Sequence, residues 1–171
     1  MTGLRNRRIE MHRRAWLFIV VFLTAAAGSS CFSSFDLSKP SREEISSPSR
    51  WRISSRNKDF TNLEKALDTD TDTVALSGSN YKGASFTLDL GQVCPFNMVV
   101  LFHGGEEFGF ARKVCLSISI DGKNFRDVHV APGTRGLTYL MLMTPVNARY
   151  LRFAAVEQGS RPWAIGGIFL Q

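Results

Sequence analysis

Residues 85–125 alternate short apolar runs with turn signals, and this pattern restricts the fold more than any other feature of the chain. Apolar and polar residues alternate over 85–90, so one face of an extended segment points to a core and the other to water. Gly91 ends this predicted strand, 99–102 is a short apolar run typical of a more buried strand, and 114–120 alternates again before a second turn. Successive strands joined by turns favour an antiparallel sheet.

The remainder of the chain adds four predicted strands, over residues 124–130, 137–143, 147–153 and 165–170. No helical stretch separates them, and Pro145 is predicted to break the chain between the second and third. Ahead of the strands, 60–67 has the apolar spacing of one or two helical turns. We therefore expect an all-β fold, an antiparallel β-sandwich or jelly roll.

The length and composition fit one folded domain with an N-terminal appendage. The chain has 171 residues, of which 44% are hydrophobic, and this content excludes a disordered protein. Most of the formal charge of +6 comes from five arginines within residues 1–30, so the rest of the chain is nearly neutral. The sequence therefore predicts no nucleic-acid partner.

The N-terminal region has the pattern of an export signal. A basic head precedes an apolar run over residues 16–28, shorter than the roughly 20 residues that a membrane span needs. Small residues and then Cys31 follow, an order that resembles a bacterial lipoprotein signal, although Gly28 stands where such signals usually carry an aliphatic residue. Lipidation of Cys31, ordinary cleavage after a small residue and a retained membrane anchor all remain open.

These observations predict three parts: a signal peptide or membrane anchor over 1–30, a Ser/Pro-rich tether over 31–50 and a folded domain over 51–171. We expect export across the inner membrane, with attachment to the cell envelope as a lipoprotein or release as a secreted or periplasmic protein. The membrane is then contacted only through the N-terminal anchor or lipid. An oxidising compartment permits a disulfide between Cys94 and Cys115, and two buried thiols are the equal alternative.

A turn-rich segment carries carboxylates at alternate positions: Asp68, Asp70 and Asp72, followed by Thr73. Such hard oxygen atoms are the ligands that calcium prefers. The Gly and the distant Glu of an EF-hand are missing. The alternative is a solvated turn in which these side chains bond to their own backbone.

Four segments together resemble one family in their order along the chain. They are Ala66-Leu67-Asp68 with Thr73, the Asp-Leu-Gly run over 86–91, the Ser-Ile-Asp-Gly run over 118–125, and the Ala-Arg-Tyr-Leu-Arg run over 145–153. This set resembles the discoidin, or coagulation-factor type C, domain, over roughly residues 51–171. The resemblance implies a galactose-binding-like β-sandwich that is mostly a non-catalytic binding module for glycans, lipid surfaces or proteins.

The resemblance also implies a structural calcium ion, held by Asp68, Asp70, Thr73 and a backbone carbonyl such as that of Ala66. Two family positions differ here, however. Ala75 stands where a Trp commonly follows the acidic loop, and Gly167 stands where a Glu often completes the calcium site.

The family's sugar-binding Arg and Asn are replaced by His103 and Phe108 in the loop over 103–110. Aromatic faces can stack on a sugar while carboxylates accept from its hydroxyls. The candidate ligand-binding residues are therefore the aromatic and charged residues of this loop and of the loop before the last strand: His103, Glu106, Phe108, Phe110, Arg161 and Trp163. The alternative is that the aromatic residues pack at the rim or core and that His103 is a satisfied residue at a strand end.

No catalytic constellation is present in the sequence. Glu106 and Glu107 are adjacent, with no second carboxylate placed for glycoside hydrolysis, and no nucleophile motif occurs. The sequence thus predicts a non-catalytic extracytoplasmic module that binds carbohydrate at the cell envelope. The alternative function is an adhesion or assembly protein whose sandwich binds another envelope protein.

Overall fold

The computed structural model describes residues 47–171. The predicted signal, Cys31 and most of the predicted tether lie outside the described residues. Within the described part of the chain, no helix has the length and apolar character needed to cross a membrane.

The described residues form nine strands and two short 3-10 helices. In chain order these are η1 (Pro48–Arg50), β1 (Arg52–Ser54), β2 (Phe60–Thr61), η2 (Leu63–Leu67), β3 (Ala75–Ser77), β4 (Ser85–Phe102), β5 (Lys113–Ser119), β6 (Arg126–Pro132), β7 (Leu137–Glu157), β8 (Ala164–Ile165) and β9 (Gly167–Leu170).

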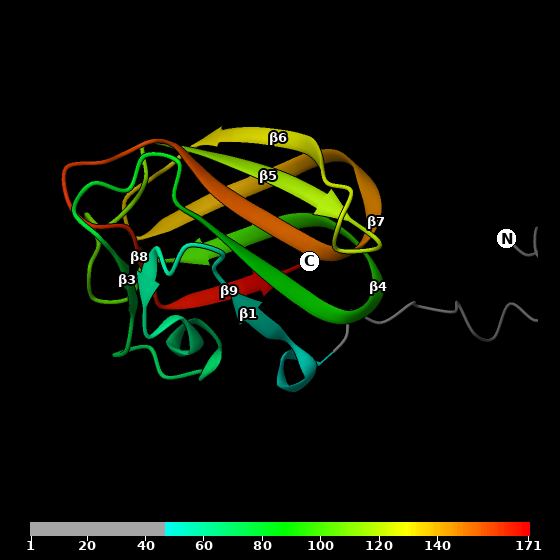
Figure 1. Ribbon diagram of the computed structural model, residues 1–171, viewed down its shortest axis with the longest axis horizontal. Coiled ribbons are helices and arrows are strands. Elements are labelled where there is room, and N and C mark those ends of the chain that lie inside the picture. The colour runs from blue at the N-terminus through cyan, green and yellow to red at the C-terminus, as the bar shows by residue number, and fades with distance from the viewer. Residues whose placement is uncertain (1–46) are drawn as a thin grey trace, which may run out of the picture. The chain divides into compact units, whose positions relative to one another are not determined.

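Two long antiparallel strands, β4 and β7, organise the domain. Ser85 pairs with Ala154 at one end of this ladder and Phe102 pairs with Leu137 at the other. The ribbons of both strands curve over together in Figure 1. The register of the pair shifts between Asp89 and Cys94 and again between Phe96 and Met98. Because bulges bend a strand pair, a single hydrogen-bonded sheet is folded into the two layers of a sandwich.

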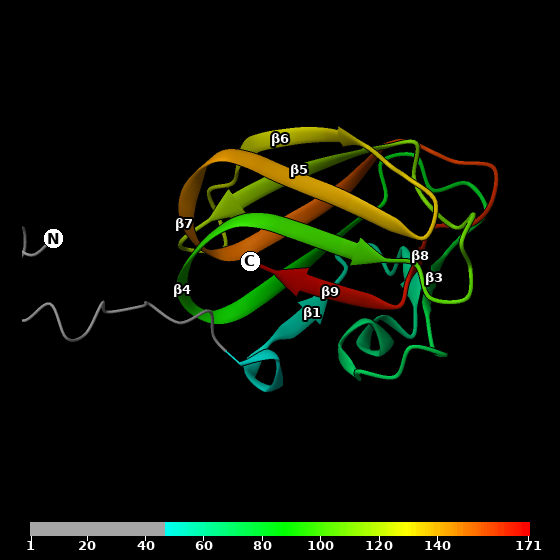
Figure 2. The same cartoon turned by 180° about the vertical axis from the view of Figure 1, so that it is seen from behind.

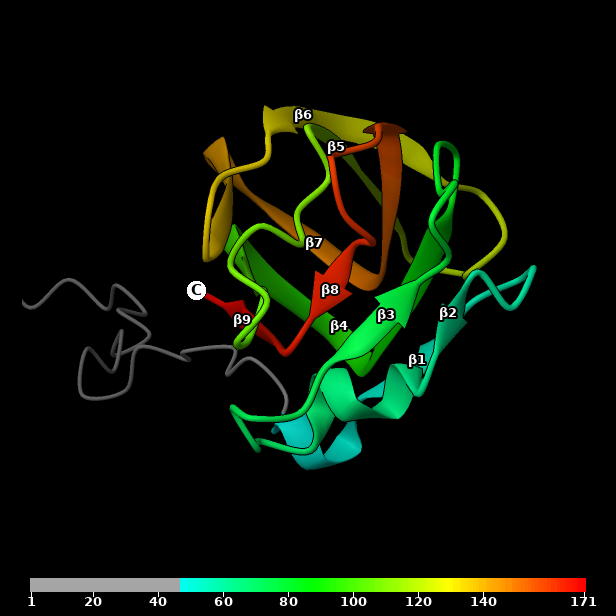
Figure 3. The ribbon, with the colours of Figure 1, turned by 90° about the vertical axis from the view of Figure 1, so that its left-hand side faces the viewer.

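Each layer adds shorter strands to one half of the long pair. The first half of β4 pairs with β1, and the second half of β7 pairs with β5, which carries β6. The second half of β4 pairs with β9, so β9, β4 and β7 form the other layer, seen from behind in Figure 2. A separate small sheet with the order β2-β3-β8 lies at the end of the sandwich that faces the viewer in Figure 3.

The core lies between the layers and is rich in aromatic rings. Phe86 and Phe153 stack with ring centroids 4.9 Å apart, and Trp163 lies 5.5 Å from the rings of both Phe86 and Phe60. Along the first half of β4, buried residues alternate with partly exposed ones, as the sequence predicts. The all-β, antiparallel sandwich is therefore confirmed.

Two predicted strand breaks are wrong. Gly91 and Pro145 lie inside β4 and β7, so four of the predicted strands are halves of two long ones. Gly91 has a backbone φ of 78°, a left-handed conformation that glycine adopts without steric cost. Pairing therefore resumes beyond it at Cys94. The predicted helical turns over 60–67 divide into strand β2 and the 3-10 helix η2.

Cys94 and Cys115 form no disulfide, so the alternative of two buried thiols is correct. Burial raises the pKa of the Cys115 thiol. A raised pKa disfavours the thiolate, which is the reactive form.

Candidate functional site

Four loops gather at one end of the sandwich, over residues 78–84, 103–112, 133–136 and 158–163 (Figure 3). Backbone hydrogen bonds join the second of these loops to its neighbours. The N–H of Gly136 donates to the Glu107 carbonyl over 3.0 Å, and the N–H of Ala164 donates to the Gly109 carbonyl over 2.8 Å. The loop over 103–112 is thus held from both sides, and we call this region the loop end.

His103 is one of the residues that hold the loop end together. Its side chain is fully buried. Nδ1 donates to the Ala164 carbonyl over 2.7 Å, which leaves Nε2 to accept from the Thr138 hydroxyl over 2.9 Å. Burial lowers the pKa of His103, so the ring is neutral near pH 7. The prediction that His103 contacts a ligand gives way to the alternative of a satisfied strand-end histidine, because no surface ligand reaches a buried ring.

Trp163 and Phe110 are also drawn inward. The Trp163 side chain is fully buried and belongs to the aromatic core. Phe110 is half-buried, its ring 6.2 Å from that of His103, and its carbonyl accepts from the Tyr81 hydroxyl over 3.2 Å. Of the predicted aromatic ligand contacts, Trp163 is therefore a packing residue and Phe110 is only partly accessible.

Phe108 is the aromatic residue that the loop end presents to solvent, with 47% of its surface exposed. Two guanidinium groups lie over its ring, that of Arg135 at 4.6 Å and that of Arg161 at 5.9 Å from the centroid. Arg135 Nε donates to Glu107 Oε2 over 2.7 Å, and Arg161 lies 3.7 Å from Glu106. We call these five residues the Phe108 cluster.

The charges of the Phe108 cluster balance one another, since two carboxylates face two guanidinium groups. Its surface therefore offers a half-exposed aromatic ring beside hydrogen-bond donors and acceptors, without a net charge. That combination suits a neutral, polyhydroxylated ligand. Three predicted ligand residues meet here, namely Glu106, Phe108 and Arg161, whereas the sequence reasoning missed Arg135, whose only signal is its place in the turn after Pro132.

The predicted calcium residues form a self-bonded turn. Asp68 accepts from the backbone N–H of Asp70 over 3.0 Å and from the Thr73 hydroxyl over 2.8 Å, and Asp70 accepts from the N–H of Asp72. No group of three or more His, Cys, Asp or Glu side chains placed to hold a metal occurs within residues 47–171.

The donors of this turn fit calcium in kind, because they are all hard oxygens. Asp68, Asp70 and Thr73, with the carbonyl of Ala66, would hold the ion, which would brace the turn. Gly167 lies on β9 and adds no carboxylate. We propose that any calcium site here is weak, since two carboxylates supply little charge.

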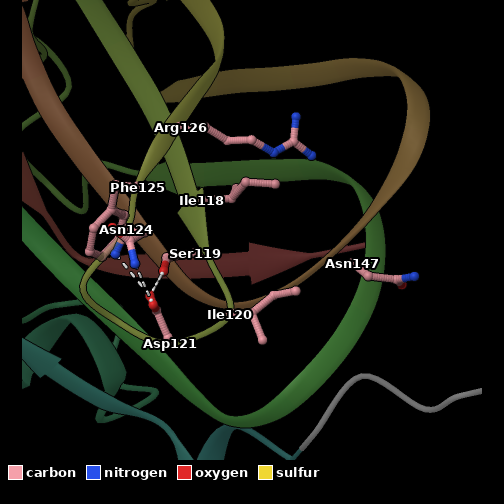
Figure 4. Close-up of a pocket in the computed structure, with 8 residues that line it drawn as sticks. All are labelled: Ile118, Ser119, Ile120, Asp121, Asn124, Phe125, Arg126 and Asn147. Carbon is pink, nitrogen blue, oxygen red and sulfur yellow. Dashed lines mark hydrogen bonds between the residues drawn. The ribbon is translucent and has the colours of Figure 1, made fainter.

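Two surface hollows lie away from the loop end, around the turn between β5 and β6. The first has a volume of about 420 Å³ and is lined by the residues drawn in Figure 4. The second has a volume of about 510 Å³ and lies over β1, β4 and β7. Phe125 lines both hollows.

The fold defines the class of this protein as a galactose-binding-like β-sandwich. The model of the F5/8 type C domain matches residues 46–167, and the chain belongs to that family. The resemblance that the sequence motifs indicate is thereby confirmed. No curated protein matches the chain.

Solved structures with the same fold include three modules of Clostridium perfringens. The family 32 CBM of NanJ, in complex with galactose, has a TM-score of 0.63 at 14% identity, over 72% of this chain and 94% of that one. CpGH89CBM32-5, in complex with GalNAc-β-1,3-galactose, has a TM-score of 0.63 at 18% identity, over 72% and 96%. CBM32-3 of a family 31 glycoside hydrolase has a TM-score of 0.60 at 19% identity, over 77% and 97%.

Proposed function

We propose that this chain is a non-catalytic, extracytoplasmic module that binds a neutral carbohydrate at its loop end. The observation that carries the proposal is the Phe108 cluster, in which an exposed ring is surrounded by paired charges. The ring stacks on the apolar face of a sugar, while Glu106 and Arg161 exchange hydrogen bonds with its hydroxyls. Membership of the F5/8 type C family and the carbohydrate-binding modules with the same fold support this function.

The geometry favours binding over catalysis. Glu106 and Glu107 are each turned to an arginine, Arg161 and Arg135, and both carboxyl groups are solvent-exposed. Glycoside hydrolysis needs two carboxyl groups on opposite sides of one bond, whereas both glutamates here are paired with arginines. Export and attachment through Cys31 belong to the same proposal.

A glycan array probed with residues 32–171 tests the function. We expect binding to neutral glycans, and we expect Phe108→Ala to weaken it about tenfold or more, since an aromatic anchor at the centre of a site carries much of its affinity. Phe169→Ala is the matched control, because Phe169 is similarly exposed, at 57%, on β9. Equal losses in both variants would contradict the assignment of the site.

One observation favours the alternative of an adhesion or assembly protein. The outer face of the layer β9-β4-β7 carries exposed apolar side chains, including Tyr139, Met141 and Phe169. Exposed apolar patches are common at protein interfaces. If the wild-type fragment is silent on every glycan, the protein-partner function becomes the better one.

A further inference from the structure

The outer face of β1, β4 and β7 carries polar side chains in two rows across the three strands. Paired positions place Arg52, Asp89 and Tyr150 in one row. Ser54, Thr87 and Arg152 make the next row, two residues along each strand. The alternate residues Leu88 and Leu151 point into the core, so both rows face outward.

Two walls turn this face into a groove of about 510 Å³. The first wall is the turn between β5 and β6, which folds over the sheet. A Cβ placed on Gly122 would lie 3.1 Å from the Tyr150 ring, and the Phe125 ring lies 4.4 Å from the Arg152 guanidinium. The second wall is the segment after β1, with Ser55 and Arg56.

The first wall is rigid because one carboxylate organises it. Asp121 accepts from the Ser119 hydroxyl and from the backbone N–H groups of Lys123 and Asn124, each over 2.8 Å. Figure 4 shows Asp121 between Ser119 and Asn124. Hydrogen bonds from Asn124 and then Lys123 hold the pKa of Asp121 well below its usual range. The groove is therefore formed before any ligand arrives, which lowers the cost of binding.

The groove has an excess of positive charge. Arg52, Arg56 and Arg152 line it, and within residues 47–171 none of them has a carboxylate oxygen within 4.0 Å. The one carboxylate of the lining, Asp89, accepts from Nε and Nη2 of Arg149, over 2.8 and 3.0 Å.

Two further carboxylates near the groove are also engaged. Asp59 accepts from the backbone N–H of Ser85 over 3.1 Å, and Asp127 accepts from the Ser117 hydroxyl over 2.7 Å. Neither carboxylate lies within 4.0 Å of a lining guanidinium group, and Arg52 Nη1 donates to the neutral Trp51 carbonyl over 3.1 Å. In the described part of the chain, the three lining guanidinium groups therefore have no ion-pair partner and can bind an anion from outside.

The rest of the lining suits a sugar. The hydroxyls of Ser54, Thr87 and Tyr150 have no hydrogen-bond partner within the described part of the chain, so they are available to the hydroxyls of a ligand. Guanidinium groups bind carboxylate and sulfate with two parallel hydrogen bonds. Stacking on Phe125 orients the guanidinium of Arg152 for such a contact.

We propose that this arginine groove is a second binding site, for an acidic carbohydrate that carries carboxylate or sulfate groups. The site shares no residue with the Phe108 cluster, so it stands even if the loop end binds nothing. A polymer can pass along it, because the groove lies open on the sheet face.

Titration calorimetry of residues 32–171 tests the proposal with polygalacturonate, dextran sulfate and neutral dextran as probes. We expect binding to one or both acidic polymers and none to dextran, and the preferred polymer identifies carboxylate or sulfate as the group recognised. The double variant Arg52→Gln/Arg152→Gln should lose at least tenfold in affinity, and Arg56→Gln, at an exposed position, should lose several-fold.

The matched control is Arg112→Gln/Lys65→Gln, which removes the same charge outside the groove and should change affinity less than about twofold. Equal losses in the control and the groove variant, no loss in the groove variants, or tighter binding of a single-stranded oligonucleotide would each overturn the proposal. Phe108→Ala should leave binding of the acidic polymers unchanged, which separates failure of this site from failure of the loop end.

Discussion

The Phe108 cluster and the arginine groove both use arginine beside an aromatic ring, but they differ in their counter-charges. At the loop end Arg135 and Arg161 face Glu107 and Glu106, so the surface is neutral. In the groove, Arg152 stacks on Phe125 without a carboxylate within 4.0 Å, in the described part of the chain. If both proposals hold, the acidic partner of an arginine, more than the arginine itself, decides whether a site selects neutral or anionic ligands.

Ionic strength gives the largest contrast between the two sites. Raising the salt concentration from about 50 to 500 mM shortens the screening length severalfold. We expect the affinity of the groove for an acidic polymer to fall about tenfold or more, while neutral-sugar binding at the loop end changes less than about twofold. Calorimetry at both salt concentrations measures this, and parallel salt dependence would abolish the distinction.

Acid should weaken the loop end and spare the groove. While its ring is neutral, His103 joins the loop over 103–112 to Thr138 on β7 and to Ala164 on β8, and burial lowers its pKa. The unfolded chain therefore binds the proton more readily. This contribution to stability is complete above the ordinary histidine pKa of about 6.5 and is lost as the pH falls below it, by at most about 1.4 kcal/mol per pH unit.

Urea unfolding at pH 7.5 and 5.5 measures this loss, and the NMR titration of the His103 ring gives its pKa directly. His129→Gln is the control, because His129 lies on β6 and is only half-buried. A wild-type stability that is flat over this range, with His103 titrating normally, would show that the ring is not a clamp.

Calcium should produce the smallest effect, again at the loop end. A Cβ on Gly104 would lie 3.6 Å from the Thr71 carbonyl, so the acidic turn packs beside the start of the loop over 103–112. We expect millimolar calcium to raise the melting temperature by a few degrees at most, and EDTA to reverse it, since only two carboxylates take part. Asp68→Asn should remove the response, and the absence of any shift in the wild type would remove the metal from this site.

The fold was largely predictable from the sequence, because strand periodicity and turn residues are local signals. The alternation over 85–90 located the first half of β4 correctly. The continuity of β4 through Gly91 was not predictable, since it depends on pairing with β7, which is distant in the sequence. Strands β1, β2 and β3 were missed because two or three residues show no period.

The site was less predictable, because loop residues carry no periodicity that separates inward from outward side chains. Phe108 and Phe110 are two residues apart, yet Phe108 is exposed and Phe110 is half-buried. Trp163 resembles a sugar platform in the sequence, but its place in the core follows from its contacts with Phe60 and Phe86. The pairing of Glu107 with Arg135 needs two loops to meet, which only the fold decides.

The pairing of β4 with β7 also bears on how this domain reaches its native state. The contact between Ser85 and Ala154 closes a loop of chain that contains β5 and β6. Contacts between residues far apart in the sequence slow folding, because chain entropy is lost before they form. The first half of β4 can pair early with β1 on one edge, but its other edge stays open until β7 has been synthesised, so folding of this domain should be slow and dependent on its C-terminal half.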